Sequence, residues 1–185
     1  TIIHRSVYQF VVQGGGYRMR IEGGSVAALD PIATYGPIAN EFSPDRSNLR
    51  GTIAMAKLPG DPHSATSQWF VNLADNSANL DYQNGGFTVF GRVLGGVLGE
   101  GMDLFDAIGD LYTYNLNPYY DRFGALGYPF SEVPLIYFQG AYYFVAVTGI
   151  SVLQAGTFEW RAPDGSGPAA WAMPQNWMPG GIPDG

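Results

Sequence analysis

The feature that most constrains the fold is a strand-forming run that ends in three glycines. Residues 1–12 are dominated by Ile, Val, Tyr and Phe, and Gly14, Gly15 and Gly16 follow almost at once. β-Branched and aromatic residues favour strands, whereas glycine accepts the backbone angles of sharp turns. The pattern predicts one strand over residues 1–12 that ends at a glycine turn, and it favours a strand-and-turn fold.

The same alternation of short apolar runs and turn residues continues along the chain. The chain has 26 Gly, 13 Pro and 15% aromatic residues, with only 14% charged residues. Strands are predicted over residues 51–56, 68–73, 87–93 and 142–152, and the sequence Pro59-Gly60-Asp61-Pro62 separates the first two. These signals predict a mainly β domain with few helices.

One segment has the periodicity of a helix. Met102, Phe105 and Ile108 recur at three-residue intervals, so a helix is expected over residues 101–111. The Tyr-, Pro- and Asn-rich stretch over about 111–141 lacks periodicity and is interpreted as a long inserted loop. We expect one domain over residues 1–155 and a Pro/Gly/aromatic-rich tail over 156–185 that wraps the domain or is partly disordered.

Charge and composition exclude several functional classes. The net charge of −7, with nine Lys and Arg residues, argues against nucleic-acid and anionic-membrane partners. The chain has no cysteine and only two histidines, so neither a metal site nor a cofactor is expected. No stretch reaches the roughly 20 apolar residues that span a bilayer.

Four segments, in order, resemble the cyclophilin family of peptidyl-prolyl isomerases. They are residues 3–16, 40–57, 61–72 and 79–93. The resemblance implies an eight-stranded antiparallel barrel. The runs at 50–56 and 64–68 are similar to those of bacterial members. The family's first strands and helix have no counterpart here, so we expect a fragment of a longer protein, with a nicked chain or a shortened variant as alternatives.

The resemblance implies a catalytic role for Arg5 and Gln13. Rotation about an X-Pro bond faces a barrier of about 18–20 kcal/mol because amide resonance is lost. A fixed guanidinium donates toward the substrate at the twisted state, and no nucleophile is needed. We expect a bulge or a twist of the strand to aim Gln13 at the cleft of Arg5. The alternative for Arg5 is an arginine in a surface ion pair.

The resemblance also implies a proline pocket beside these two residues. The substrate-binding positions are Phe10, Val11, Ala56, Lys57, Gln68, Phe70, Asn79, Leu80 and Phe87. Core packing is the alternative for Phe70 and Leu80. Neither histidine is expected to be a catalyst: His63 is interpreted as a solvated loop residue, and His4 as a structural residue on the opposite face of the strand.

Several pocket positions depart from the common family pattern. Val11, Lys57, Asn79 and Phe87 replace residues frequent in the family, and Asn79 stands where an aromatic residue helps to bind cyclosporin. We therefore expect weak cyclosporin binding.

Three functions remain open at this point. An isomerase acting on proline-containing peptides and unfolded proteins is favoured. A catalytically weak peptide-binding module and an unrelated structural β domain are the alternatives. Localisation is unknown, although the absence of cysteine and the acidic pI favour a periplasmic or secreted protein over a cytoplasmic one.

Overall fold

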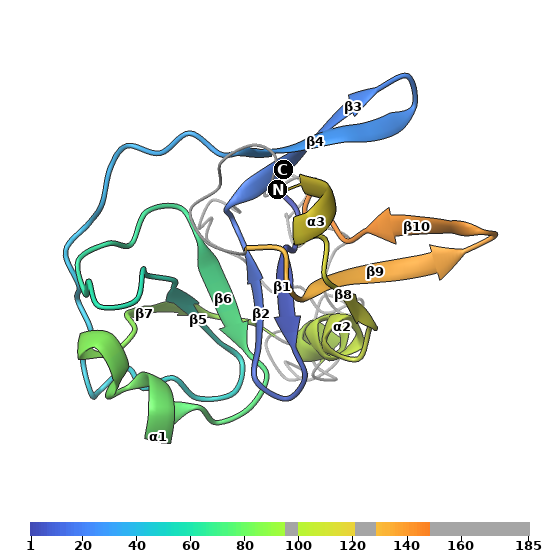
Figure 1. Ribbon diagram of the computed structural model, residues 1–185. Coiled ribbons are helices and arrows are strands. Elements are labelled where there is room, and N and C mark those ends of the chain that lie inside the picture. Colours follow the sequence, from blue (N-terminus) through green and yellow to red (C-terminus); the bar gives the residue numbers. More distant parts are fainter. Residues whose placement is uncertain (95–99, 121–128, 149–185) are drawn as a thin grey trace, which may run out of the picture.

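The computed structural model describes residues 1–94, 100–120 and 129–148 (Figure 1). Its central element is a five-stranded antiparallel sheet in the order β1-β2-β6-β5-β7. The strands are β1 (Arg5–Val7), β2 (Val11–Gly14), β5 (Thr52–Met55), β6 (Trp69–Asn72) and β7 (Val89–Arg92). The prediction of a mainly β fold with few helices is confirmed, and the three runs at 51–56, 68–73 and 87–93 all contain strands.

The prediction of one strand over residues 1–12 is wrong. The chain turns back at Tyr8–Phe10, so that β1 and β2 form a hairpin in which Arg5 lies opposite Gln13. Gln9 has φ 52° in this turn, and the Phe10 N–H donates to the Val7 carbonyl at 3.0 Å. Residues opposite each other in an antiparallel pair share one face of the sheet. Gln13 therefore needs no bulge to join Arg5.

Two smaller sheets flank the central one. β3 (Tyr17–Glu22) pairs with β4 (Ser25–Pro31), and β9 (Val133–Phe138) lies between β8 (Thr113–Tyr114) and β10 (Ala141–Phe144). Beyond β10, the chain returns to the residues that precede β1, where the Ile3 N–H donates to the Val145 carbonyl at 2.9 Å. The strands of the described residues thus form three sheets, whose ladders do not join into one closed eight-stranded ring.

The segment 111–141 differs from the predicted long loop. It contains β8, the short helix α3 (Asn117–Tyr120) and β9, and β10 begins at its end. The loop interpretation rested on the Tyr, Pro and Asn content of the stretch and on its lack of periodicity, and proline cannot donate to a ladder. Pro134 nevertheless pairs with Thr113 within the β8–β9 ladder, and both Val133 and Leu135 are buried. The tail over 156–185 lies outside the described residues, as does the end of the strand predicted over 142–152.

The helices are few and short. α1 (Ser77–Leu80) and the 3-10 turn η1 (Gln83–Gly85) connect β6 to β7, and α2 (Glu100–Gly109) confirms the helix predicted from periodicity. α2 packs Met102, Phe105 and Ile108 against a core cluster that includes Val12 and Leu73. No helix in the described part of the chain is long and apolar enough to cross a membrane.

Candidate active site

One row of residues crosses the central sheet and faces a single side. Arg5 lies opposite Gln13, Gln13 opposite Phe70, Phe70 opposite Ala54, and Ala54 opposite Val89. Opposed residues in neighbouring strands have Cβ atoms about 5 Å apart. The sheet therefore places a guanidinium, an amide and an aromatic ring side by side, from β1, β2 and β6.

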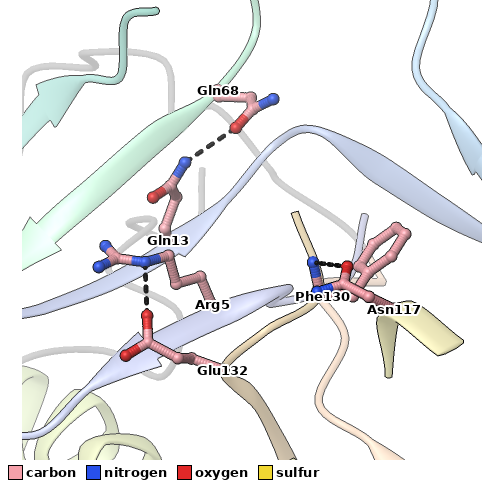
Figure 2. Close-up of polar contacts among 6 residues, drawn as sticks. All are labelled: Arg5, Gln13, Gln68, Asn117, Phe130 and Glu132. Carbon is pink, nitrogen blue, oxygen red and sulfur yellow. Dashed lines mark hydrogen bonds and ion pairs between the residues drawn. The ribbon is translucent and has the colours of Figure 1, made fainter. Parts of the chain in front are cut away.

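The polar end of this row consists of Arg5, Gln13, Gln68 and Glu132, which we call the polar group. The Gln13 Nε2 atom donates to Gln68 Oε1 at 2.8 Å, and the Arg5 Nε atom donates to Glu132 Oε2 at 2.9 Å. Figure 2 shows Gln13 and Glu132 on opposite sides of the Arg5 guanidinium. Both side chains of the ion pair are about one-third exposed, at 34% for Arg5 and 39% for Glu132. The polar group is thus ordered yet accessible.

The glycine turn after β2 leaves room for Gln68. A Cβ atom on Gly16 would lie 2.9 Å from the Gln68 side-chain amide carbon, and one on Gly15 would lie 2.3 Å from the Ser67 carbonyl oxygen. Gly15 also has φ 83°, which side chains other than glycine rarely adopt. These two glycines let the chain before β6 approach β2 closely enough for the two glutamines to bond.

The apolar end of the row belongs to a buried cluster, which we call the apolar cluster. It consists of Val11, Ala54, Phe70, Leu80 and Val89, with Phe10, Ala56 and Phe87 packed against it. The rings of Phe70 and Phe87 meet edge to face, with centroids 5.7 Å apart. Aromatic and aliphatic side chains of this kind form apolar surfaces that suit a proline ring.

Lys57 contacts the apolar cluster at the ring of Phe87. Its Nζ atom lies 4.7 Å from the centre of the Phe87 ring and donates to the carbonyl of Asn84 at 2.9 Å and to that of Gly86. Burial of this ammonium group lowers the pKa of Lys57. The Ala56 N–H donates to the Gln68 carbonyl at 2.9 Å, so it is already engaged within the sheet.

A network of buried amides supports the apolar cluster from behind. Asn48 and Asn72 are fully buried. Asn48 Nδ2 donates to Asp81 Oδ1 at 2.8 Å and to the Phe87 carbonyl at 3.0 Å, whereas Asn72 Nδ2 donates to Asn48 Oδ1 at 3.3 Å. Asn76 Nδ2 donates to the Phe10 carbonyl at 2.9 Å and to Asn72 Oδ1 at 2.8 Å. The network therefore fixes the backbone at two members of the apolar cluster.

The carboxylate of Asp81 is the charged member of this amide network. Burial opposes its ionisation, but hydrogen bonds from Ser47 and Asn48 outweigh that effect and lower the pKa of Asp81. The sequence-based prediction missed the network because neither spacing nor composition marks a buried asparagine.

His4 lies behind Arg5, on the opposite face of β1. It is buried, its ring meets the edge of Tyr17 at 5.0 Å, and its Nδ1 atom has no hydrogen-bond partner in the described part of the chain. Burial lowers the pKa of His4 to about 4; a contact with Gln68 partly offsets this, and the charge of Arg5 adds to it. His4 is therefore a neutral core residue, which agrees with its structural interpretation.

The structure brings most of the predicted residues together. Arg5, Gln13 and Gln68 lie in the polar group, and Phe10, Val11, Ala56, Phe70, Leu80 and Phe87 lie in or against the apolar cluster. Asn79 is exposed on α1 and takes no part in the cluster. Glu132 was not predicted, because it lies 127 residues from Arg5 and no local pattern connects the two.

Two surface hollows are lined by other residues. One includes Tyr8, Arg50 and Asp106, and the other includes Glu41, Arg46 and Phe90. Neither contains a predicted site residue, so a concave surface over the row from Arg5 to Phe70 stays a prediction.

The described site is an apolar cluster that lies beside an accessible arginine and two bonded glutamines on one face of an antiparallel sheet. The model of the cyclophilin type peptidyl-prolyl cis-trans isomerase/CLD family matches residues 1–122. The chain belongs to this family.

Several bacterial proteins are similar in sequence. A peptidyl-prolyl cis-trans isomerase of Acinetobacter baylyi is 40% identical over 114 residues, which is 61% of this chain and 53% of that protein. Peptidyl-prolyl cis-trans isomerase A of Dickeya dadantii is 40% identical over 121 residues, covering 64% of this chain and 56% of the relative. Peptidyl-prolyl cis-trans isomerase B of Escherichia coli is 37% identical, covering 61% and 63%. The chain thus spans between half and two thirds of the length of these relatives.

A crystal structure of a Cryptosporidium parvum cyclophilin type isomerase in the presence of the dipeptide Ala-Pro is also similar, with a TM-score of 0.41 and 24% identity. The match covers 58% of this chain and 61% of that one.

Proposed function

We propose that this protein is a peptidyl-prolyl cis-trans isomerase that binds proline-containing peptides and unfolded proteins and rotates their X-Pro bonds. The observation that carries the proposal is the row from Arg5 through Gln13 to Phe70 on one face of three neighbouring strands. Membership of the cyclophilin family supports the activity, and the sources of the similar proteins support a bacterial origin and a role in protein folding.

The proposed mechanism divides the work between the two ends of the row. The apolar cluster, with Phe70 and Phe87 edge to face, holds the proline ring. Arg5 donates to the substrate carbonyl and to the lone pair that the prolyl nitrogen regains in the twisted state. Gln13, held by Gln68, orients the substrate backbone. No bond other than hydrogen bonds forms or breaks.

Replacement of Arg5 tests the proposal. Loss of one fixed donor to the transition state costs about 10²- to 10³-fold in rate, so Arg5→Ala should lower kcat/KM by that factor on a short Ala-Pro-Phe peptide. Exchange NMR spectroscopy or a protease-coupled assay measures the rate, and Arg18→Ala on β3 is the matched control.

Equal rates for wild type and Arg5→Ala would refute the catalytic role. A wild-type protein that binds the peptide but does not accelerate its exchange would instead be a peptide-binding module.

We also propose that cyclosporin binds weakly, because Asn79 offers no aromatic surface at the position beside Leu80. Asn79 is exposed, so Asn79→Trp leaves the core untouched and should strengthen binding by roughly 1 kcal/mol or more, as expected for a newly buried aromatic surface. Titration calorimetry of both proteins measures the difference, and low-nanomolar binding by the wild type would contradict the proposal.

A further inference from the structure

Glu132 is the acidic side chain that contacts Arg5, and it lies beyond residues 1–122, which the family model matches. Its Oε2 atom accepts the Arg5 Nε–H at 2.9 Å. We propose, resting on the isomerase function above, that Glu132 is a positioning residue that fixes the orientation of the Arg5 guanidinium. The segment outside the matched region then completes the catalytic site.

The backbone of Glu132 is anchored to the same strand as its side chain. The Ser6 N–H donates to the Glu132 carbonyl at 2.8 Å, one residue along β1 from Arg5. Glu132 therefore contacts two successive residues of β1, one through its main chain and one through its side chain. The main-chain bond keeps Glu132 beside β1, so its carboxylate stays within reach of Arg5 and favours one orientation of the guanidinium.

The turn that precedes Glu132 is held in place independently of Arg5. The Phe130 N–H donates to Asn117 Oδ1 at 3.0 Å, and its carbonyl accepts the Leu116 N–H at 2.7 Å. Phe130 is 1% exposed, and its ring meets the edge of Tyr17 with centroids 4.7 Å apart. Figure 2 shows this anchor beside the Arg5–Glu132 pair. Glu132 thus extends from a fixed segment and does not depend on the arginine for its position.

The choice of Nε as the bonded atom suits a positioning role. A guanidinium is planar, so a bond at Nε sets the plane and direction of the whole group. Figure 2 shows the bond to Glu132 at Nε and draws none from the two terminal nitrogens. The terminal nitrogens therefore keep their N–H donors for the substrate. Because the arginine side chain is already oriented, it loses less rotamer freedom when the transition state forms.

Charge and orientation predict opposite effects of this contact. The carboxylate partly neutralises Arg5, which by itself would weaken stabilisation of the twisted amide. Orientation favours catalysis, because a displacement of about 1 Å at a reacting group can cost about 10²-fold in rate. We assign the larger effect to orientation, since both partners are accessible to solvent and water screens the charge.

The test uses Glu132→Ala and Glu132→Gln in the full chain. Glu132→Ala should lower kcat about tenfold with little change in KM, because the donor remains but is no longer oriented. Glu132→Gln keeps an acceptor oxygen and should recover most of the rate. Asp30→Ala is the matched control, since Asp30 pairs with Arg20 through Nε at 3.2 Å on the β3–β4 hairpin and should leave kcat unchanged.

A spectroscopic measurement separates positioning from folding. The Arg5 Nε–H should give a distinct, slowly exchanging NMR signal in the wild type and in Glu132→Gln, and this signal should be lost in Glu132→Ala while the backbone amide spectrum is kept. If the wild type is active and Glu132→Ala has an equal or higher kcat, the positioning role is overturned, but the isomerase function is not. A wild type that does not accelerate exchange above the uncatalysed rate would overturn the isomerase function, and this inference with it.

Discussion

The apolar cluster and the polar group are held in place by different forces, although they share one row of the sheet. The apolar cluster is buried and is supported by the amide network of Asn48, Asn72, Asn76 and Asp81. The polar group is about one-third exposed at Arg5 and depends on two side-chain contacts, Arg5 with Glu132 and Gln13 with Gln68.

Under the proposed function, this difference separates substrate recognition from catalysis. A proline ring needs a surface that keeps its shape, and buried hydrogen bonds with all partners satisfied provide such rigidity. A catalytic guanidinium must instead reach the substrate, so it cannot be buried in the same way. Changes to the apolar cluster should therefore appear first as lost stability, and changes to the polar group as lost activity.

The largest expected effect comes from breaking the amide network. Asn48→Ala removes the side-chain donors to Asp81 and to the Phe87 carbonyl, and it removes an acceptor of the fully buried Asn72 amide. Each such group costs about 1–3 kcal/mol, so the free energy of unfolding should fall by about 3–5 kcal/mol in urea titration.

The exposed Asn79 provides the control for this prediction. Asn79→Ala should change the free energy of unfolding by less than about 0.5 kcal/mol. If Asn48→Ala were equally mild, the amide network would not support the apolar cluster.

A second prediction concerns pH and the buried His4, which lies behind the polar group. The pKa of His4 falls from 6.5 to about 4 on folding, so between these values the unfolded chain binds more protons than the folded one. Stability is therefore complete above pH 6.5 and is lost as the pH falls through this window. A difference of about 2.5 pKa units corresponds to about 3 kcal/mol.

Urea titrations between pH 7 and pH 4 measure this loss. His4→Gln should flatten the pH dependence, whereas His63→Gln on its exposed loop should retain it. An unchanged slope in His4→Gln would show that carboxylates alone cause the acid sensitivity.

Most residues of both groups could be predicted from the sequence, whereas the contacts that hold the polar group could not. Phe70, Leu80 and Phe87 lie in segments that carry the family resemblance, and the structure brings them into one cluster. The hairpin between Arg5 and Gln13 was missed because its turn, Tyr8–Phe10, contains no Gly, Pro or Asn, and Gln9 adopts a positive φ without a residue type that favours it.

Glu132 could not be predicted for a different reason. Its contact with Arg5 depends on the anchoring of Phe130 by Asn117 and on the return of β9 toward β1, and both are long-range features of the fold. The segment over 111–141 also lacks a periodic signal, so neither its strands nor its carboxylate was assigned a role in advance.

The smallest expected effect concerns the bond between Gln13 and Gln68. Both glutamines are half-buried, and a single neutral hydrogen bond contributes about 1 kcal/mol. A double-mutant cycle with Gln13→Ala, Gln68→Ala and the double variant should therefore give a coupling energy of about 1 kcal/mol in kcat/KM, with less in the free energy of unfolding. Since neither side chain supports the apolar cluster, KM should change less than kcat. Additive effects, or a larger loss of stability than of activity, would contradict the proposed division, in which the polar group serves activity and the apolar cluster serves stability.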